Sequence, residues 1–294
     1  MRSPQPWARC GMNAAPREPA LVTGELYSES SGDSDAAAPL VLLHGWGLNL
    51  RVFDRLRAAL GAEQRVLAID LPGHGASPWA GQASGQQWLA CIADLLPRAA
   101  TLLGWSLGGQ LALQLASRAS LAVRRLVLVA TSPRFVRAAD WPHGLAAATL
   151  QQFAAQLERD PQQTVADFLE LQVRGSLDAP AVRASLRQAL QQHGTARPEA
   201  LRAALALLEH NDLRELARGI NIPTLVVTGQ YDRVTPPQAG QALAQLLPQG
   251  RLLQIARAGH APFISHPQQV SAALLEFMRD EARVRPNGGR RATS

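Results

Sequence analysis

The sequence contains little cysteine and no lysine. Only two cysteines, Cys10 and Cys91, occur in 294 residues. Two thiols are too few for the disulfide framework of a small secreted protein or for a cysteine-rich metal site. We therefore expect a reducing compartment, the cytoplasm, and neither a metal ion nor a cofactor.

Long apolar runs are also missing. No stretch approaches 18 uninterrupted apolar residues, and the first 38 residues hold no apolar run of signal-peptide length. The sequence thus predicts no membrane span and no secretion by that route. We expect residues 1–20, rich in Pro, Arg and Ala, to be a disordered extension, and residues 283–294 to be a flexible tail.

The charge balance is basic, with a formal net charge of +6, and all 29 basic residues are arginine. Nucleic-acid binding is not expected, because aromatic residues make up only 5% of the chain and no basic stripe alternates with them. Two explanations remain open. The arginines reflect the host's composition, or they attract an acidic partner protein.

Short apolar runs alternate with helical stretches along most of the chain. Continuous rather than alternating hydrophobicity is typical of parallel strands that are buried on both faces, so the pattern predicts an α/β fold with a mostly parallel, doubly wound sheet. Residues 28–38 are instead expected to form a turn or loop. The predicted strands are Leu40–Leu43, Val66–Ile69, Thr101–Leu103, Leu126–Ala130, Thr224–Thr228 and Leu252–Ile255, and predicted helices include Arg51–Ala59, Gln86–Leu96, Leu107–Ser117 and Pro237–Leu247.

Residues 134–218 interrupt this alternation with four helical segments and no strand-like run. One segment has Asp160 as its N-cap and Pro161 at its first position. Another begins at Pro198. We expect residues 134–218 to form a helical lid, inserted into a core made of residues 21–133 and 219–282.

A serine held between glycines directly follows the third predicted strand, as Gly104-Trp-Ser106-Leu-Gly108. A Gly-x-Ser-x-Gly sequence suits a sharp strand-to-helix turn that presents the serine hydroxyl to a cleft. Asp232 and His260 likewise follow predicted strands, and side chains at the carboxyl ends of parallel strands converge. The chain order Ser, Asp, His is that of α/β-hydrolases.

These three residues fit nucleophilic catalysis. Ser106 needs a base to attack at neutral pH, His260 can supply it, and Asp232 can fix the imidazole tautomer. For the oxyanion we expect the backbone N–H groups of Leu107 and Trp46. Asp70 also follows a strand but precedes the serine, so a loop-shaping role suits it better.

Several motifs together resemble the pimeloyl-[acyl-carrier protein] methyl ester esterase family of biotin synthesis, over about residues 39–278. The family resemblance implies catalysis by Ser106, Asp232 and His260, with substrate contacts at Trp46, Leu107 and the lid segment. The motifs are His-Gly-Trp-Gly within Val41–Asn49, Asp-Leu-Pro-Gly-His-Gly at Asp70–Gly75, Gly-Trp-Ser-Leu-Gly-Gly at Gly104–Gly109, Phe-Leu-Glu-Leu-Gln at Phe168–Gln172, and His260–Pro267.

The resemblance also implies an acyl-carrier protein as partner, docked on arginines of the lid such as Arg174, Arg183 and Arg187. Family members have arginines before the Phe-Leu-x-Leu-Gln stretch, where this chain has Gln163 and Asp167. The docking surface is therefore expected to differ. The substrate contacts that the resemblance implies are Trp46, Ser106, Leu107, Phe168, Leu169, Glu170, Leu171, Gln172 and His260.

Other functions share parts of this pattern. A broad short-chain carboxylesterase or a carbon–carbon bond hydrolase would use the same triad on small substrates. A dehalogenase is disfavoured, because that chemistry needs aspartate where Ser106 stands. A ligand-binding receptor with an unused triad is the alternative of another class. In every case nothing in the sequence demands more than a monomer.

Overall fold

The computed structural model describes residues 25–32, 38–62, 64–81, 84–118, 121 and 123–280. The expected extension at 1–20 and tail at 283–294, together with Cys10, lie outside the described residues. Cys91 is buried. No described helix is long and apolar enough to cross a membrane.

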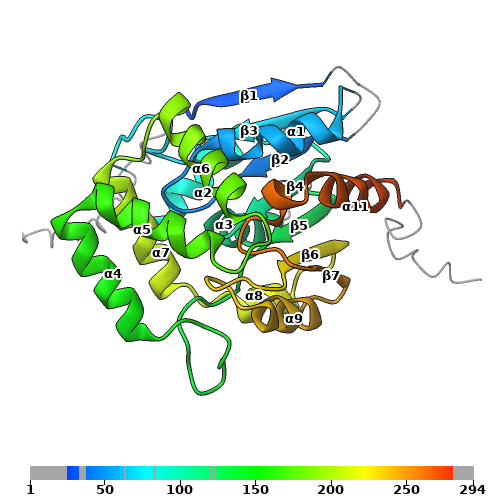
Figure 1. Cartoon of the computed structure of the whole chain (residues 1–294). Helices are drawn as coiled ribbons and strands as arrows, with labels where there is room; N and C mark the ends of the chain where they lie inside the picture. Colours follow the sequence, from blue (N-terminus) through cyan, green and yellow to red (C-terminus); the bar gives the residue numbers. More distant parts are fainter. Residues whose placement is uncertain are drawn as a thin grey trace, which may run out of the picture.

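A seven-stranded sheet in the order β1-β3-β2-β4-β5-β6-β7 forms the centre of the molecule (Figure 1). β1 pairs antiparallel with β3, and all the other neighbours are parallel. The predicted mostly parallel sheet is therefore confirmed. The strands are β1 Ser28–Ser31, β2 Leu40–Leu43, β3 Val66–Ile69, β4 Thr101–Trp105, β5 Arg125–Val129, β6 Thr224–Gly229 and β7 Gly250–Ile255.

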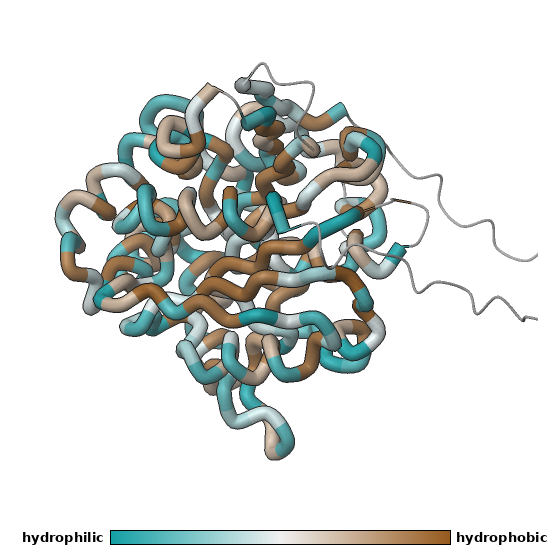
Figure 2. Tube along the Cα trace, turned by 90° about the vertical axis from the view of Figure 1, so that its right-hand side faces the viewer, coloured by the Kyte–Doolittle hydropathy of each residue, from teal (hydrophilic) through white to brown (hydrophobic). Residues whose placement is uncertain are grey.

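The apolar strands are buried because helices cover both faces of the sheet. In β4, for example, Leu102 packs with one core cluster and Leu103 with the other, since successive side chains point to opposite faces. Figure 2 shows these central strands as the most hydrophobic part of the chain. One face is covered by α2 (Gly85–Ala93), α3 (Leu107–Ala116) and α9 (Pro237–Leu246), and the other by α1 (Asp54–Leu60) and α11 (Pro267–Arg279).

The prediction of a loop at residues 28–38 is wrong for its first four residues. Ser28–Ser31 form the edge strand β1, and residues 33–37 are not described. The sequence Ser-Glu-Ser-Ser offers no apolar residue to mark a strand. Backbone pairing of Ser28 with Ile69 and of Ser31 with Val66 holds this edge in place.

Between β5 and β6 the chain forms a group of helices that lies together at the left of Figure 1. α4 packs against α5 and α7, and α5 packs against α6. A fifth, short helix, α8, packs on α3 and α9 instead, so one more helix is present than the sequence predicted. The bounds are α4 Ala147–Arg159, α5 Pro161–Val173, α6 Ala179–His193, α7 Pro198–His210 and α8 Arg214–Arg218, with the short helices η1 Leu50–Phe53 and α10 Pro262–Ser265 elsewhere.

Local chemistry sets the start of α5 as expected. The Asp160 side chain accepts a hydrogen bond from the Gln163 N–H, and Pro161 occupies the first helical turn. Side chains of the core then tie the ends of α6 and α7. Asn49 Nδ2 donates to the Ala189 and Gly194 carbonyls, and Trp46 Nε1 donates to the Leu201 carbonyl at 3.0 Å.

Candidate active site

Ser106 occupies the turn between β4 and α3 in a backbone conformation that residues other than glycine rarely adopt. Its φ is 55° and its ψ is −116°. The turn needs glycine on both sides because the backbones pack closely there. A Cβ at position 104 would lie 2.2 Å from the Gly108 carbonyl oxygen, and one at position 108 would lie 2.3 Å from the Leu43 oxygen. Strain of this kind is concentrated at functional sites.

Hydrogen bonds from the neighbouring strand support this turn. The Ser106 N–H donates to the Val129 carbonyl at 2.9 Å, and the Thr131 hydroxyl donates to the Ser106 carbonyl at 2.7 Å. Ser106 itself is 2% exposed. Its position is therefore fixed by β5 as well as by its own strand and helix.

Asp232 and His260 come from the loops after β6 and β7, and the structure brings them together. His260 Nδ1 lies 2.8 Å from Asp232 Oδ2. The other carboxylate oxygen accepts the N–H groups of Val234 and Thr235, at 2.8 and 2.9 Å. The Thr235 hydroxyl donates to Oδ2 at 2.7 Å. Sequence reasoning missed Thr235, because a hydroxyl three residues after a loop aspartate carries no distinctive pattern.

Trp105 connects His260 to the serine turn. Its indole Nε1 donates to the His260 carbonyl at 2.8 Å, and its ring centroid lies 5.6 Å from that of the imidazole. Trp105 immediately precedes Ser106, so one side chain links the two loops. The second ring nitrogen, His260 Nε2, is buried and has no hydrogen-bond partner in the described part of the chain. A neutral imidazole with Nδ1 bonded to a carboxylate can accept a proton at this atom.

The expected oxyanion donors lie on the two segments that flank Ser106. Leu107 is the first residue of α3, where an N–H has no acceptor within its own helix. Trp46 lies in the loop after β2, and a Cβ on its neighbour Gly45 would lie 3.3 Å from the Ser106 Cβ. This loop therefore contacts the serine. Backbone N–H groups at such positions, aided by the helix dipole, can stabilise a developing negative charge.

Aromatic rings form an apolar wall beside the histidine. The Phe168 ring lies 5.2 Å from Trp46, 5.7 Å from Phe153 and 6.5 Å from His260, measured between centroids. Phe153, on α4, was not identified from the sequence, because it belongs to no recognised motif. Leu171 packs into the same hydrophobic cluster as these rings, whereas Leu169 packs into the cluster on the other face.

Gln172 has the most unusual environment of the predicted substrate contacts. Its carbonyl accepts the His260 N–H at 3.2 Å, which joins the end of α5 to the histidine loop. Its side chain is 1% exposed, and neither amide atom has a hydrogen-bond partner among the residues described. A buried, unsatisfied amide costs free energy unless a ligand completes it.

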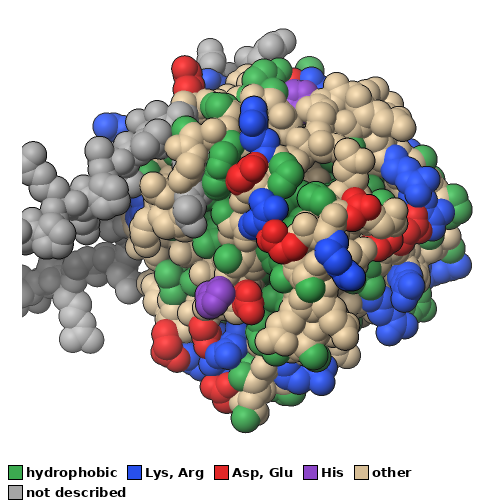
Figure 3. All heavy atoms as spheres, turned by 90° about the vertical axis from the view of Figure 1, so that its left-hand side faces the viewer, with side chains coloured by type: hydrophobic (Ala, Val, Ile, Leu, Met, Phe, Trp, Pro, Cys, Tyr) green, Lys and Arg blue, Asp and Glu red, His purple; other side chains and the backbone are tan. Residues whose placement is uncertain are grey.

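Glu170 and two of the predicted docking arginines bind one another in the lid. The Glu170 carboxylate pairs with Arg183 at 2.8 Å and with Arg187 at 3.1 Å, so its partners are on α6. Arg183 and Arg187, which were predicted to dock a carrier, therefore already have a partner in Glu170, and the roles predicted for these three residues stay predictions. Figure 3 shows acidic and basic side chains interleaved on this side of the molecule. Arg174 is exposed, at the end of α5.

Asp70 shapes a loop, as its position before the serine predicted. Its carboxylate accepts the N–H groups of Leu50 and Ala76 and bonds to His193 at 2.7 Å. Burial raises its pKa. His74 is fully buried, and burial lowers its pKa to about 4. No group of three or more potential metal ligands occurs in the described ranges.

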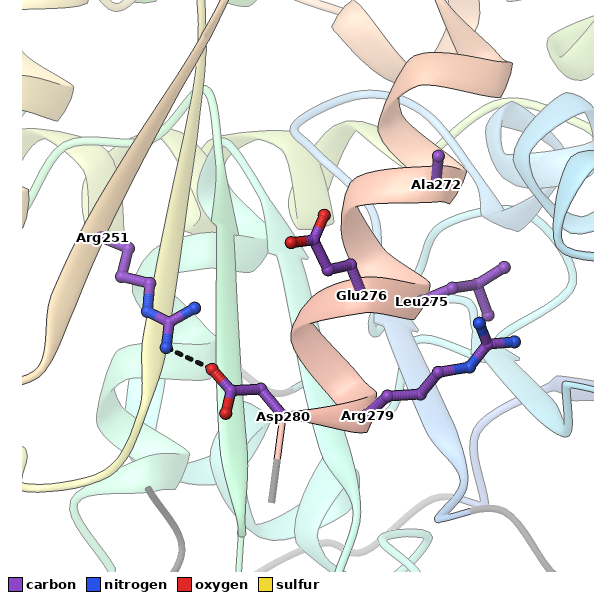
Figure 4. Close-up of a pocket in the computed structure, with 6 residues that line it drawn as sticks. All are labelled: Arg251, Ala272, Leu275, Glu276, Arg279 and Asp280. Carbon is purple, nitrogen blue, oxygen red and sulfur yellow. Dashed lines mark hydrogen bonds and ion pairs between the residues drawn. The ribbon is translucent and has the colours of Figure 1, made fainter. Parts of the chain in front are cut away.

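A surface hollow lies between β7 and α11, away from Ser106, Asp232 and His260 (Figure 4). Arg251, near the start of β7, bonds across it to Asp280. The hollow is at the amino end of a parallel strand, whereas Ser106, Asp232 and His260 follow carboxyl ends. Binding sites of open α/β sheets lie at the carboxyl ends, so the hollow is not the candidate site.

Comparison with known proteins adds a family likeness. The family model described as alpha/beta hydrolase fold matches residues 38–267. The pimeloyl-[acyl-carrier protein] methyl ester esterase of Nitrosomonas europaea is 43% identical over 83% of this chain and 96% of its own length. The protein of that name from Chromobacterium violaceum is 42% identical, covering 83% and 95%. Among solved structures, an esterase from Rhodococcus matches with a TM-score of 0.72 and 27% identity, covering 87% of this chain and 94% of that one.

Proposed function

The chain belongs to the α/β-hydrolase family and, within it, to the pimeloyl-[acyl-carrier protein] methyl ester esterases, and we propose that it hydrolyses the methyl ester of pimeloyl-[acyl-carrier protein]. The products are methanol and the free carboxylate, still attached to the carrier. The observation that carries this proposal is the buried Nε2 of His260, which has no hydrogen-bond partner among the described residues. The other ring nitrogen of His260 is held by Asp232, and Trp105 joins the histidine loop to the Ser106 turn.

In the first half of the reaction Ser106 is the nucleophile. Its Oγ forms a bond to the ester carbonyl carbon while His260 Nε2 takes the hydroxyl proton. The Asp232 carboxylate stabilises the imidazolium that results. The N–H groups of Leu107 and Trp46 bind the tetrahedral oxyanion, and each such donor supplies about 2.7–4 kcal/mol of transition-state stabilisation. Collapse breaks the bond to the methoxy oxygen, which leaves as methanol with the proton from His260.

In the second half water replaces methanol. His260 Nε2 removes a proton from the water as its oxygen attacks the acyl-serine carbonyl, and the same oxyanion donors act again. Breaking the bond to Ser106 Oγ returns the proton to the serine and releases the carboxylic acid, which ionises at neutral pH. The cycle consumes one water and needs neither a metal nor a cofactor.

The aromatic side chains beneath the lid favour a substrate with a long apolar chain. We assign residues 134–218 as the lid, residues 21–133 and 219–282 as the core, and the ring cluster of Trp46, Phe153 and Phe168 as a wall of the acyl passage. Leu171 and Gln172 extend this wall toward His260. We propose that the protein acts as a monomer in the cytoplasm.

The test compares two substrates and one variant. Purified protein is expected to release methanol from the carrier-bound methyl ester and p-nitrophenol from p-nitrophenyl acetate, and Ser106→Ala is expected to abolish both. A ligand-binding receptor would release neither. Growth without biotin, restored to a strain that lacks its pimeloyl ester esterase, is the cellular readout. Failure to restore growth at good expression, with acetate hydrolysis intact, would leave a general carboxylesterase.

A further inference from the structure

Three loops meet on the surface directly outside Asp232 and His260. They are residues 172–178 at the end of α5, residues 230–235 after β6 and residues 255–260 after β7. The Leu177 N–H donates to the Arg257 carbonyl at 2.9 Å, and the Tyr231 N–H donates to the Ala258 carbonyl at 2.8 Å. A Cβ on Gly175 would lie 3.0 Å from the Tyr231 Cβ. The three loops thus form one continuous surface.

Large apolar side chains are exposed on this surface. Leu177 is 54% exposed and Tyr231 is 41% exposed. They are two of the four large hydrophobic residues that are exposed in the described part of the chain, and the loop contacts place them close together. Apolar side chains rimmed by charge are typical of protein–protein contact surfaces.

The charges that surround them are arginines. Arg174, Arg233 and Arg257 are exposed, and within the described residues the guanidinium of each makes no hydrogen bond or ion pair. Arg183 and Arg187, by contrast, are paired with Glu170. Asp178 is the one exposed acid in the three loops. The surface therefore has an excess of positive charge that no group of the described protein neutralises.

The backbone of Arg257 adds an independent observation. Its φ is 59°, one of four positive values at non-glycine residues among those described, and Ser106 is another. Glycine would adopt this conformation without strain, so the arginine is kept at a cost of order 1–3 kcal/mol. Residues held in this way are concentrated at ligand clamps and active sites.

We propose that Arg174, Leu177, Tyr231, Arg233 and Arg257, the triad-rim patch, dock the acidic carrier protein that bears the substrate. The inference rests on the proposed function and assigns its partner surface. A carrier seated there lies beside the loops of Asp232 and His260, so its tethered acyl chain has a short route to the serine. Acidic side chains of the carrier would pair with the three free guanidinium groups, and an apolar side chain would cover Leu177 and Tyr231.

The test is Arg174→Glu/Arg257→Glu, with Arg98→Glu/Arg124→Glu as the matched control. The control pair carries the same charge change, and both arginines are exposed at the amino ends of β4 and β5, on the opposite edge of the sheet. We expect kcat/KM for the carrier-bound methyl ester to fall by about tenfold or more, mainly through KM, in the patch variant alone. Hydrolysis of p-nitrophenyl acetate should remain within about twofold in both variants.

Added salt supplies a second readout that does not depend on substitution. Wild-type kcat/KM for the carrier-bound ester should fall as salt rises, and the patch variant should lose this dependence. If Arg174→Glu/Arg257→Glu loses acetate hydrolysis or its folded spectrum, Arg174→Gln/Arg257→Gln replaces it, with a smaller loss expected in the same direction.

The outcomes separate the two proposals. If wild type does not hydrolyse the carrier-bound ester at all, the proposed function fails. If wild type hydrolyses it and the patch and control variants lose equal activity, the docking surface is overturned while the function stands. A concentration-dependent dimer, seen by sedimentation and abolished by the patch variants alone, would assign the surface to a second copy of this chain and overturn the carrier assignment.

Discussion

The same carboxylate oxygen, Asp232 Oδ2, lies 2.8 Å from His260 Nδ1 and accepts a 2.7 Å hydrogen bond from the Thr235 hydroxyl. Two backbone N–H groups hold the other oxygen. The aspartate therefore cannot rotate without losing several bonds, and it presents one oxygen to the imidazole in a fixed direction.

Asp232→Asn keeps the shape of this side chain and removes its charge. An amide cannot stabilise an imidazolium and can force the wrong histidine tautomer, so kcat for p-nitrophenyl acetate should fall by about 10³–10⁴-fold. Steady-state kinetics measure the loss. Asp94→Asn, at an exposed acid following α2, is the control and should keep wild-type kcat. A fall of less than tenfold in Asp232→Asn would contradict the triad.

Thr235 should act as a positioning residue for Asp232. Thr235→Val removes the hydroxyl donor while the backbone N–H bonds remain, so we expect kcat to fall about tenfold with KM unchanged. Thr235→Ser should restore most of the rate. Thr101→Val is the matched control, because the Thr101 hydroxyl is also buried but has no hydrogen-bond partner in the residues described. Equal losses in Thr235→Val and Thr101→Val would show that the effect is not specific to the carboxylate.

Gly108→Ala tests the close packing behind the serine turn. The new Cβ would lie 2.3 Å from the Leu43 oxygen and 2.6 Å from the His44 oxygen, both backbone atoms. The backbone must move, so the free energy of unfolding should fall by roughly 1–3 kcal/mol in urea denaturation. Activity should fall too, since the same loop carries Trp46. Gly219→Ala adds a Cβ whose nearest neighbour is 3.5 Å away, and it should leave the free energy of unfolding nearly unchanged.

Burial of His74 predicts that acid destabilises the fold. Its pKa falls from 6.5 to about 4 on folding, because burial penalises the charged imidazole. Between these two pH values the unfolded chain takes up a proton that the folded chain does not. The free energy of unfolding therefore has its full value above pH 6.5 and decreases as the pH falls toward 4. The decrease caused by this group is on the order of 3 kcal/mol.

Urea denaturation at pH 7.5 and pH 5 measures the part of that loss that falls between these two pH values, about 2 kcal/mol. His74→Gln should reduce the difference between the two pH values, whereas His210→Gln, at an exposed histidine, should leave it unchanged. The same pH dependence in wild type and His74→Gln would assign the acid sensitivity to other groups.

Phe168→Ala should separate the acyl passage from the chemistry. The substitution removes a ring that contacts both Trp46 and Phe153. We expect KM for the carrier-bound seven-carbon ester to rise roughly tenfold, while KM for p-nitrophenyl acetate changes little, because an acetyl group is too short to reach the wall. Parallel rises in KM for both substrates would place Phe168 at the reacting carbon rather than along the chain.

The buried parallel strands and the serine turn could be predicted because both leave local marks in the sequence. Continuous apolar runs such as Leu40–Leu43 and the glycines around Ser106 need no knowledge of distant residues. The edge strand Ser28–Ser31 left no such mark, since only its backbone pairs. Thr235 and Phe153 gain their roles through contacts with residues far away in the chain or through loop geometry.

The lid arginines are a second example of contacts that the sequence could not predict. Arg183 and Arg187 lie on one helix face, as their spacing implied, but the spacing could not reveal that Glu170 on the preceding helix faces them. Charge counted along a sequence gives the number of cations. Only the folded chain tells which of them are already neutralised.

The positive φ of Ser106 has a lasting consequence for how this protein can evolve. Glycine would relieve the strain of the turn, but glycine carries no hydroxyl, so substitution cannot remove this strain without also removing the proposed nucleophile. A handicap of about 1–3 kcal/mol is a sizeable share of the 5–15 kcal/mol by which folded proteins usually exceed their unfolded chains. The densely packed strands on either side of that turn must offset this cost in every related protein that keeps the serine.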